Sequence, residues 1–142
     1  MKRWESRDLD QAKEYLGMRI TRDHKKRTIS LDQTCYAEKV IKRFGQEHCK
    51  PVSVPLPTGY THPRPHSDQN LLNATLQRHY QLVIGSLLYI MLGTRPDISY
   101  AVIKMSQFSS NPTEEHLQKA LYVYSLLSLF LKGTLHCVLW DR

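Results

Sequence analysis

A long stretch without hydrophobic periodicity, residues 46–77, most constrains what this chain can fold into. Five of the seven prolines lie in it, and its apolar residues follow neither the period of a helix nor that of a strand. Loops of this length are uncommon inside compact domains and usually serve as linkers. We therefore predict three parts: residues 1–45, a proline-rich linker at 46–77 that lacks fixed structure, and residues 78–142.

The first part is predicted to form a β-hairpin followed by one helix. Apolar and polar side chains alternate from Tyr15 to Arg22 and again from Arg27 to Leu31, with a polar turn between the two segments. Asp32 suits the N-cap of the next helix, and Gly45 suits its C-terminal end. The apolar residues at helical spacing between them are Tyr36, Val40, Ile41 and Phe44.

The third part is predicted to be a lobe of three helices that ends in a short strand. Thr94 is expected to cap the second of these helices with Asp97 as its capping-box partner, and Thr113 to cap the third. Leu135 to Trp140 forms the expected strand. The apolar stripe of the first helix comprises Tyr80, Val83, Ile84, Leu87, Leu88 and Met91. The fold class predicted for the whole chain is α+β.

Positive charge is concentrated in the first part of the chain. The net charge is +7, and residues 1–50 hold 13 lysines and arginines against 8 acidic residues. The cations around the predicted hairpin turn are Arg19, Arg22, Lys25, Lys26 and Arg27. Arg19 is expected to share a face with Tyr15 and with Gly17, a strand glycine that would let another backbone approach. We predict that this hairpin binds a nucleic-acid backbone; the alternative is an ordinary exposed hairpin whose charges keep a sheet edge soluble.

No catalytic residue or metal site is predicted. The sequence contains no adjacent aspartate pair, no Gly-x-Ser-x-Gly, no phosphate-binding glycine loop and no Cys-x-x-Cys. Cys49, His62 and His66 reproduce half of a zinc-finger spacing, but no cysteine stands two to four residues before Cys49, so we interpret the spacing as coincidence. His116 is expected to be a surface or capping residue rather than a base.

Targeting signals are not recognisable in the sequence. The first residues lack the apolar stretch of a signal peptide. The longest apolar run, Leu121 to Leu131, is too short to span a bilayer, and the three cysteines form no short-spaced pair. We expect an intracellular protein, cytoplasmic or nuclear, that is not secreted and has no membrane partner.

Several segments, in order along the chain, resemble the signature of copia-type retrotransposon reverse transcriptases. Tyr80–Tyr89 is similar to Y-x-x-L-I-G-S-L-x-Y, and Thr94–Val102 is similar to T-R-P-D-I-x-Y-A-V. Upstream, Asp8–Gly17 resembles D-L-G-x-x-K-Y-F-L-G, and Arg43–Val52 resembles R-F-G-x-x-x-C-K-P-V. The resemblance covers nearly the whole chain, and the order of several rare segments makes it specific.

The resemblance implies a role in an RNA-directed DNA polymerase. The hairpin would be the primer grip, the helices would be thumb and connection, and the partner would be the template–primer, an RNA–DNA or DNA duplex. The palm, with its Tyr-x-Asp-Asp carboxylates, would precede Met1, and an RNase H portion would follow Arg142; both are further expected partners. No cofactor is expected in this chain, because Mg²⁺ would bind the missing palm, and the chain is therefore not expected to be an enzyme on its own.

The sequence also departs from the pattern of that family. Asp10 stands where the family usually has Gly, and Gln107 stands where a basic residue is common. Residues 122–130 lack the family's arginines, and this stretch runs about one helical turn longer than expected. These departures favour a decayed or truncated reading frame. The alternative function is therefore a non-enzymatic helical protein–protein interaction module, a relic or co-opted transposon fragment with apolar helix faces.

Overall fold

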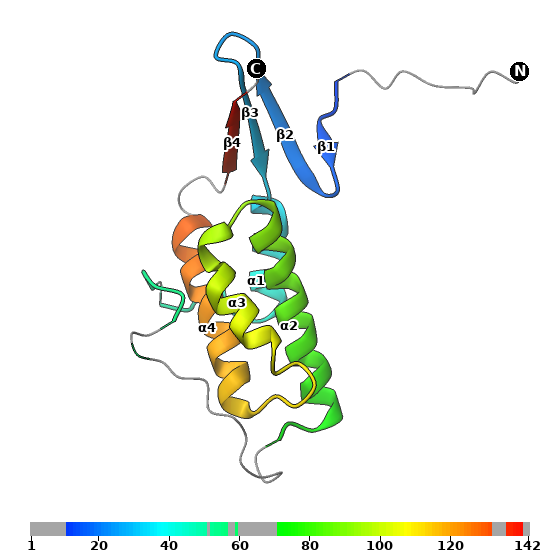
Figure 1. Cartoon of the computed structure of the whole chain (residues 1–142), viewed down its shortest axis with the longest axis vertical. Helices are drawn as coiled ribbons and strands as arrows, with labels where there is room; N and C mark the ends of the chain where they lie inside the picture. The colour runs from blue at the N-terminus through cyan, green and yellow to red at the C-terminus, as the bar shows by residue number, and fades with distance from the viewer. Residues whose placement is uncertain (1–10, 51, 57–58, 60–70, 132–135, 141–142) are drawn as a thin grey trace, which may run out of the picture.

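The computed structural model describes residues 11–50, 52–56, 59, 71–131 and 136–140, with side chains described up to residue 128. These residues form an antiparallel sheet that stands beyond one end of a bundle of helices (Figure 1). The predicted α+β fold class is confirmed. The helices contribute the core, whereas the sheet projects away from it.

The sheet contains the predicted hairpin and the predicted C-terminal strand. Its strands are β1 (Glu14–Tyr15), β2 (Met18–Asp23), β3 (Thr28–Asp32) and β4 (His136–Trp140). They pair in the order β1-β2-β3-β4, and all pairs are antiparallel. The end of the chain therefore returns to the hairpin, with His136 opposite Asp32, which the strand pattern alone did not predict.

Helical periodicity predicts the helices well. They are α1 (Thr34–Arg43), α2 (Ala74–Gly93), the short 3-10 turn η2 (Pro96–Ile98), α3 (Ser99–Ser106) and α4 (Glu114–Leu131). The predicted stripe of α2 is buried except for Leu88, which is half-buried. Asn73 caps α2 by accepting a hydrogen bond from the backbone N–H of Leu76 at 2.9 Å.

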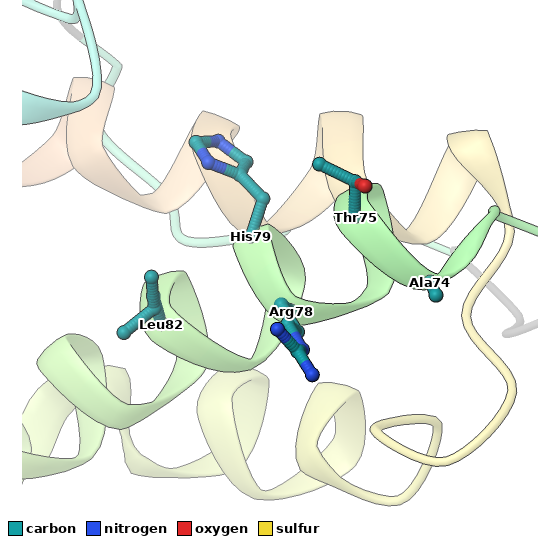
Figure 2. A pocket seen from close by; sticks show the side chains of 5 residues that line it. All are labelled: Ala74, Thr75, Arg78, His79 and Leu82. Atoms are coloured by element: carbon teal, nitrogen blue, oxygen red, sulfur yellow. The ribbon is translucent and has the colours of Figure 1, made fainter.

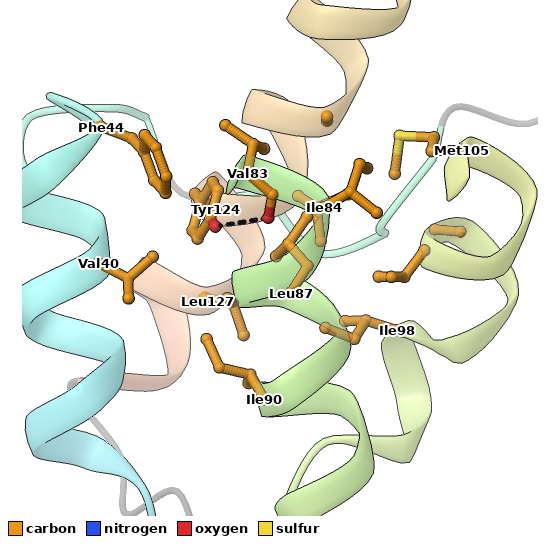
Figure 3. Packing of buried hydrophobic residues seen from close by; sticks show 14 of the residues in the cluster. Val40, Phe44, Val83, Ile84, Leu87, Ile90, Ile98, Met105, Tyr124 and Leu127 are labelled. Carbon is orange, nitrogen blue, oxygen red and sulfur yellow. Dashed lines mark hydrogen bonds between the residues drawn. The ribbon is translucent and has the colours of Figure 1, made fainter. Parts of the chain in front are cut away.

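One core joins α1 to the helices that follow residue 71 (Figure 3). Its largest fully buried side chains include Tyr80, Tyr124, Leu87, Ile90, Ile98, Met105 and Leu127. The two tyrosine hydroxyls are both satisfied: Tyr124 donates to the Val83 carbonyl at 3.1 Å, and Tyr80 donates to the Met105 carbonyl at 2.7 Å. Burial raises the pKa of the Tyr124 hydroxyl, so this group remains a donor at any physiological pH. The core therefore includes residues from both sides of the proposed linker.

Several residues of the described part of the 46–77 stretch contact the helices. Val52 donates its N–H to the Ser125 carbonyl at 3.4 Å, and Leu56 contacts the core. Leu72 donates its N–H to the Pro112 carbonyl at 2.9 Å. Of the three residues with zinc-finger spacing, Cys49 is described, and its thiol donates to the Gln46 carbonyl at 2.8 Å. His62 and His66 lie outside the described residues.

The predicted cap at Thr94 is wrong. Thr94 follows α2, and its hydroxyl donates to Gln33 Oε1 at 2.8 Å instead of capping a helix. Asp97 pairs with Arg95, whose Nε lies 2.7 Å from Asp97 Oδ1, and this hydrogen bond lowers the pKa of the Asp97 carboxyl. The helical segment begins at Pro96, which has no N–H to satisfy, so it does not require the predicted threonine cap.

The caps of α1 and α4 lie close to the predicted positions. The N-cap position of α1 is Gln33 rather than Asp32, although Asp32 accepts the Thr34 N–H at 2.7 Å. At α4, the Thr113 hydroxyl accepts the His116 N–H at 3.4 Å, and His116 Nδ1 accepts the Thr113 N–H at 3.1 Å. These two bonds form a capping box with histidine in place of glutamate. His116 is a cap, as predicted, but it is fully buried rather than on the surface.

Candidate nucleic-acid interface

The predicted strand from Tyr15 to Arg22 is interrupted by a two-residue turn. Leu16 has φ 50° and Gly17 has φ 74°, so both residues adopt the left-handed conformation that joins the strands of a tight hairpin. Gly17 is therefore a turn residue and not an interior strand glycine. Alternating apolar residues did not reveal this turn, because the alternation continues through it and a leucine at positive φ costs about 1–2 kcal/mol.

This turn places Tyr15 and Arg19 on opposite faces of the sheet. Tyr15 pairs with Met18, and Arg19 pairs with Glu14. Because paired residues share a face and successive residues alternate between faces, Tyr15 shares the face of Met18 and not that of Arg19. The prediction that Arg19 shares a face with Tyr15 is wrong, and both side chains are exposed.

The loop at residues 24–27 presents the densest positive charge of the described residues. Lys25, Lys26 and Arg27 are all exposed there. Asp23 Oδ1 accepts the backbone N–H of Lys25 at 2.9 Å and that of Lys26 at 3.0 Å, so the backbone sets the shape of the loop. The Lys26 N–H is the main reason that the pKa of the Asp23 carboxyl is lowered. These bonds are therefore present at neutral pH and are lost only as the pH falls through that lowered pKa.

Arg22 and Arg19, which flank the loop on β2, lie on opposite faces of the sheet. Arg22 pairs with Ile29 and lines a hollow of about 320 Å³ together with Ile20, Leu31 and Lys13. Arg19 lies on the other face, where its Nη2 is 3.8 Å from Cys35 Sγ. The structure thus gathers the three cations of the loop, and it places Arg19 and Arg22 on opposite faces of β2.

Sequence reasoning missed a second basic element, the exposed face of α1. Lys39, Lys42 and Arg43 are exposed on this helix. A hollow of about 280 Å³ lies where α1 meets the sheet, and its lining residues are Glu14, Gly17, Arg19, Asp32, Cys35, Tyr36 and Lys39. Lys39 and Arg19 thus border the same hollow, together with the carboxylates of Glu14 and Asp32, so cations of the hairpin and of α1 meet at one place. The spacing of Lys39 and Lys42, three residues apart on a helix, was the available signal.

A third hollow, of about 450 Å³, lies on the N-terminal half of α2 (Figure 2). Its lining residues are Ala74, Thr75, Arg78, His79 and Leu82. Figure 2 shows that His79 and Arg78 point in different directions, and His79 packs edge-on against Phe44, with 5.3 Å between ring centroids. One guanidinium beside an imidazole already in contact with the core does not form a convergent binding site.

The residues that the structure describes contain neither a cluster of metal ligands nor a membrane-spanning helix. In that part of the chain, His, Cys, Asp and Glu side chains do not gather in a group of three that could hold a metal ion. None of the helices described is both long and apolar enough to cross a membrane.

Comparison with known proteins shows that the chain is similar in sequence to parts of retrotransposon proteins. It is 34% identical over 140 residues to a retrovirus-related Pol polyprotein from transposon TNT 1-94 of Nicotiana tabacum, covering 94% of this chain and 10% of the relative. It is 39% identical over 94 residues to the Pol polyprotein from transposon RE1 of Arabidopsis thaliana, covering 63% of this chain and 6% of the relative. An uncharacterized mitochondrial protein of Arabidopsis thaliana is 35% identical over 107 residues, which cover 75% of this chain and 41% of the relative.

The chain thus resembles a short segment of a retrotransposon Pol polyprotein, and the transposon part of the sequence resemblance is confirmed. It spans about a tenth of the tobacco relative's length. No protein-family description matches the chain, and no solved structure matches it significantly.

Proposed function

We propose that this chain is the primer-grip and thumb portion of a copia-type reverse transcriptase, and that it contacts a template–primer duplex through the hairpin. The observation that carries the proposal is the loop at residues 24–27. Its three cations are exposed, and the carboxylate of Asp23, the residue just before the loop, is engaged by backbone N–H groups. Such a loop can neutralise phosphates without rearranging first.

Binding to an RNA–DNA hybrid at several salt concentrations tests this proposal. Each phosphate that the protein neutralises contributes about 0.7–0.9 to the slope of log affinity against log salt concentration. With three loop cations and one or two neighbours in contact, we expect a slope of about −3 to −4.5. Fluorescence anisotropy of a labelled hybrid would measure it. Absence of binding at low salt, or binding that salt does not weaken, would contradict the proposal.

The chain is also proposed to lack polymerase activity on its own. Phosphoryl transfer by two metal ions needs carboxylates that hold both ions, and the sequence has no adjacent aspartates. We expect no extension of a primed template in the presence of Mg²⁺ or Mn²⁺, as judged by gel electrophoresis. An added polymerase that extends the same substrate is the control, and extension that copurifies with this chain would overturn the prediction.

A second candidate function, a protein–protein interaction module, is favoured by exposed apolar side chains on α2 and α3. Leu82, Leu92, Tyr100 and Ile103 are between 50% and 80% exposed, and exposed apolar groups of this size are characteristic of interaction surfaces when they cluster. Sedimentation velocity distinguishes the two candidates. Self-association that is insensitive to salt, without binding to the hybrid, would favour the interaction module.

A further inference from the structure

We propose that Gln33 and Tyr89 are positioning residues, which hold the hairpin at a fixed orientation to the helices so that the loop at 24–27 and the lysines of α1 contact one duplex together. This inference rests on the proposed function for its consequence in binding. Whether the hairpin has a fixed orientation to the helices can be measured without nucleic acid. Neither residue contacts the nucleic acid in this proposal.

Gln33 connects the hairpin to the C-terminal end of α2. It lies between β3 and α1, and its side chain is 1% exposed. Its Nε2 donates to the Tyr89 carbonyl at 3.2 Å, and its Oε1 accepts the Thr94 hydroxyl at 2.8 Å. Gly93 leaves room for this arrangement, because a Cβ at that position would overlap the Gln33 side chain. A buried amide with both ends bonded fixes the groups that it joins.

Tyr89 extends the connection to the turn between β1 and β2. Its hydroxyl donates to the carbonyl of Leu16, and its ring lies edge-on to Tyr36, with 4.6 Å between centroids. A Cβ added at Gly17 would lie 3.3 Å from the same hydroxyl. Leu16 is in the left-handed conformation, so the bond from Tyr89 helps to hold a turn that its own side chain disfavours.

These contacts matter because the cations lie on different elements. Lys25, Lys26 and Arg27 are on the hairpin, which projects from the bundle in Figure 1, whereas Lys39 and Lys42 are on α1. A duplex can contact the cations of both elements only if their separation matches the spacing of its phosphates. If the orientation is fixed beforehand, binding does not have to order it, and affinity is higher for the same contacts.

The variant Tyr89→Phe tests this inference because it removes one hydroxyl and keeps the ring that contacts Tyr36. We expect its affinity for an RNA–DNA hybrid to fall about threefold to tenfold, the effect of ordering one or two more groups on binding. The slope of log affinity against log salt should not change, because the same phosphates are neutralised. Tyr100→Phe, at a 69% exposed tyrosine on α3, is the matched control and should bind as the unaltered chain does.

A distance measurement separates this inference from the proposed function. Spin labels at Lys26→Cys and Ile103→Cys, in a chain whose three cysteines are replaced by serine, report the hairpin's orientation to the bundle by pulsed EPR without nucleic acid. Tyr89→Phe should broaden the distance distribution, and Tyr100→Phe should not. An unchanged distribution overturns the positioning role of Tyr89 whatever the binding data show. If the unaltered chain fails to bind the hybrid, the proposed function fails, while the distribution still decides whether Tyr89 fixes the hairpin.

Discussion

Replacing Lys25, Lys26 and Arg27 together by glutamine is expected to flatten the dependence of log affinity on log salt by about two units. If the two chains bind a hybrid equally at 1 M salt, two units of slope correspond to a roughly hundredfold loss of affinity at 0.1 M. The loop should keep its shape, because Asp23 accepts backbone N–H groups that the substitutions leave in place. Anisotropy titrations over a salt series would measure both quantities.

Lysines on the helices provide the control for this variant. Lys104 on α3 and Lys119 on α4 are half-buried, and neither belongs to the hairpin or to α1. Their joint replacement by glutamine should change the slope by less than about half a unit. If this pair flattened the slope as much as the loop variant did, affinity would depend on net charge alone, and the hairpin would lose its assigned role.

Gly93→Ala is expected to destabilise the folded chain by about 1–3 kcal/mol, as overpacking of a well-filled interior does. The added methyl group would overlap Gln33, which cannot move aside without losing its bonds to Tyr89 and Thr94. Urea denaturation followed by circular dichroism would measure the loss.

A second glycine in the same helix gives the opposite expectation. Gly85 is exposed in the middle of α2, and a Cβ there would meet no atom within 4 Å. Because glycine is less favourable than alanine inside a helix, Gly85→Ala should stabilise the chain by about 0.5–1 kcal/mol. Equal effects of the two substitutions would show that Gln33 tolerates the methyl group and that its contacts are weaker than described.

Periodicity correctly predicted the helices and strands that bury one apolar face. The stripe of α2 repeats at helical spacing, so its position could be predicted without knowing its neighbours, and the same holds for the pairing of β2 with β3 around a polar turn. The C-terminal strand was predicted as a strand, but its partner β3 was not, because a strand pattern does not specify which edge it joins.

The errors arose where tertiary hydrogen bonds override local preference. Leu16 occupies a turn position that usually holds asparagine or glycine, and the Tyr89 hydroxyl that contacts it comes from α2. Thr94 looked like a helix cap because threonine often is one, but its hydroxyl bonds to a glutamine 61 positions away in the sequence. Neither partner can be inferred from neighbouring residues.

Some features of the candidate interface could likewise be predicted from the sequence, and others could not. Exposure of the cations at residues 25–27 could be predicted, since a polar turn between two strands projects into solvent. The separation of Arg19 from Arg22 onto two faces could also have been predicted, because side chains alternate along a strand. The spacing of Lys39 and Lys42 indicates a basic face on α1, but not that this face lies near Arg19, because the hollow that Lys39 shares with Arg19 exists only once the helix is placed against the sheet.

Lysine footprinting on the complex tests most directly whether the hairpin contacts nucleic acid. The chain would be acetylated with and without a saturating RNA–DNA hybrid, and the modified lysines would be quantified by mass spectrometry. We expect Lys25 and Lys26 to be protected by the hybrid, with weaker protection of Lys39 and no change at Lys104 and Lys119. Protection confined to the lysines of α3 and α4, with Lys25 and Lys26 as reactive as in the free chain, would contradict the account.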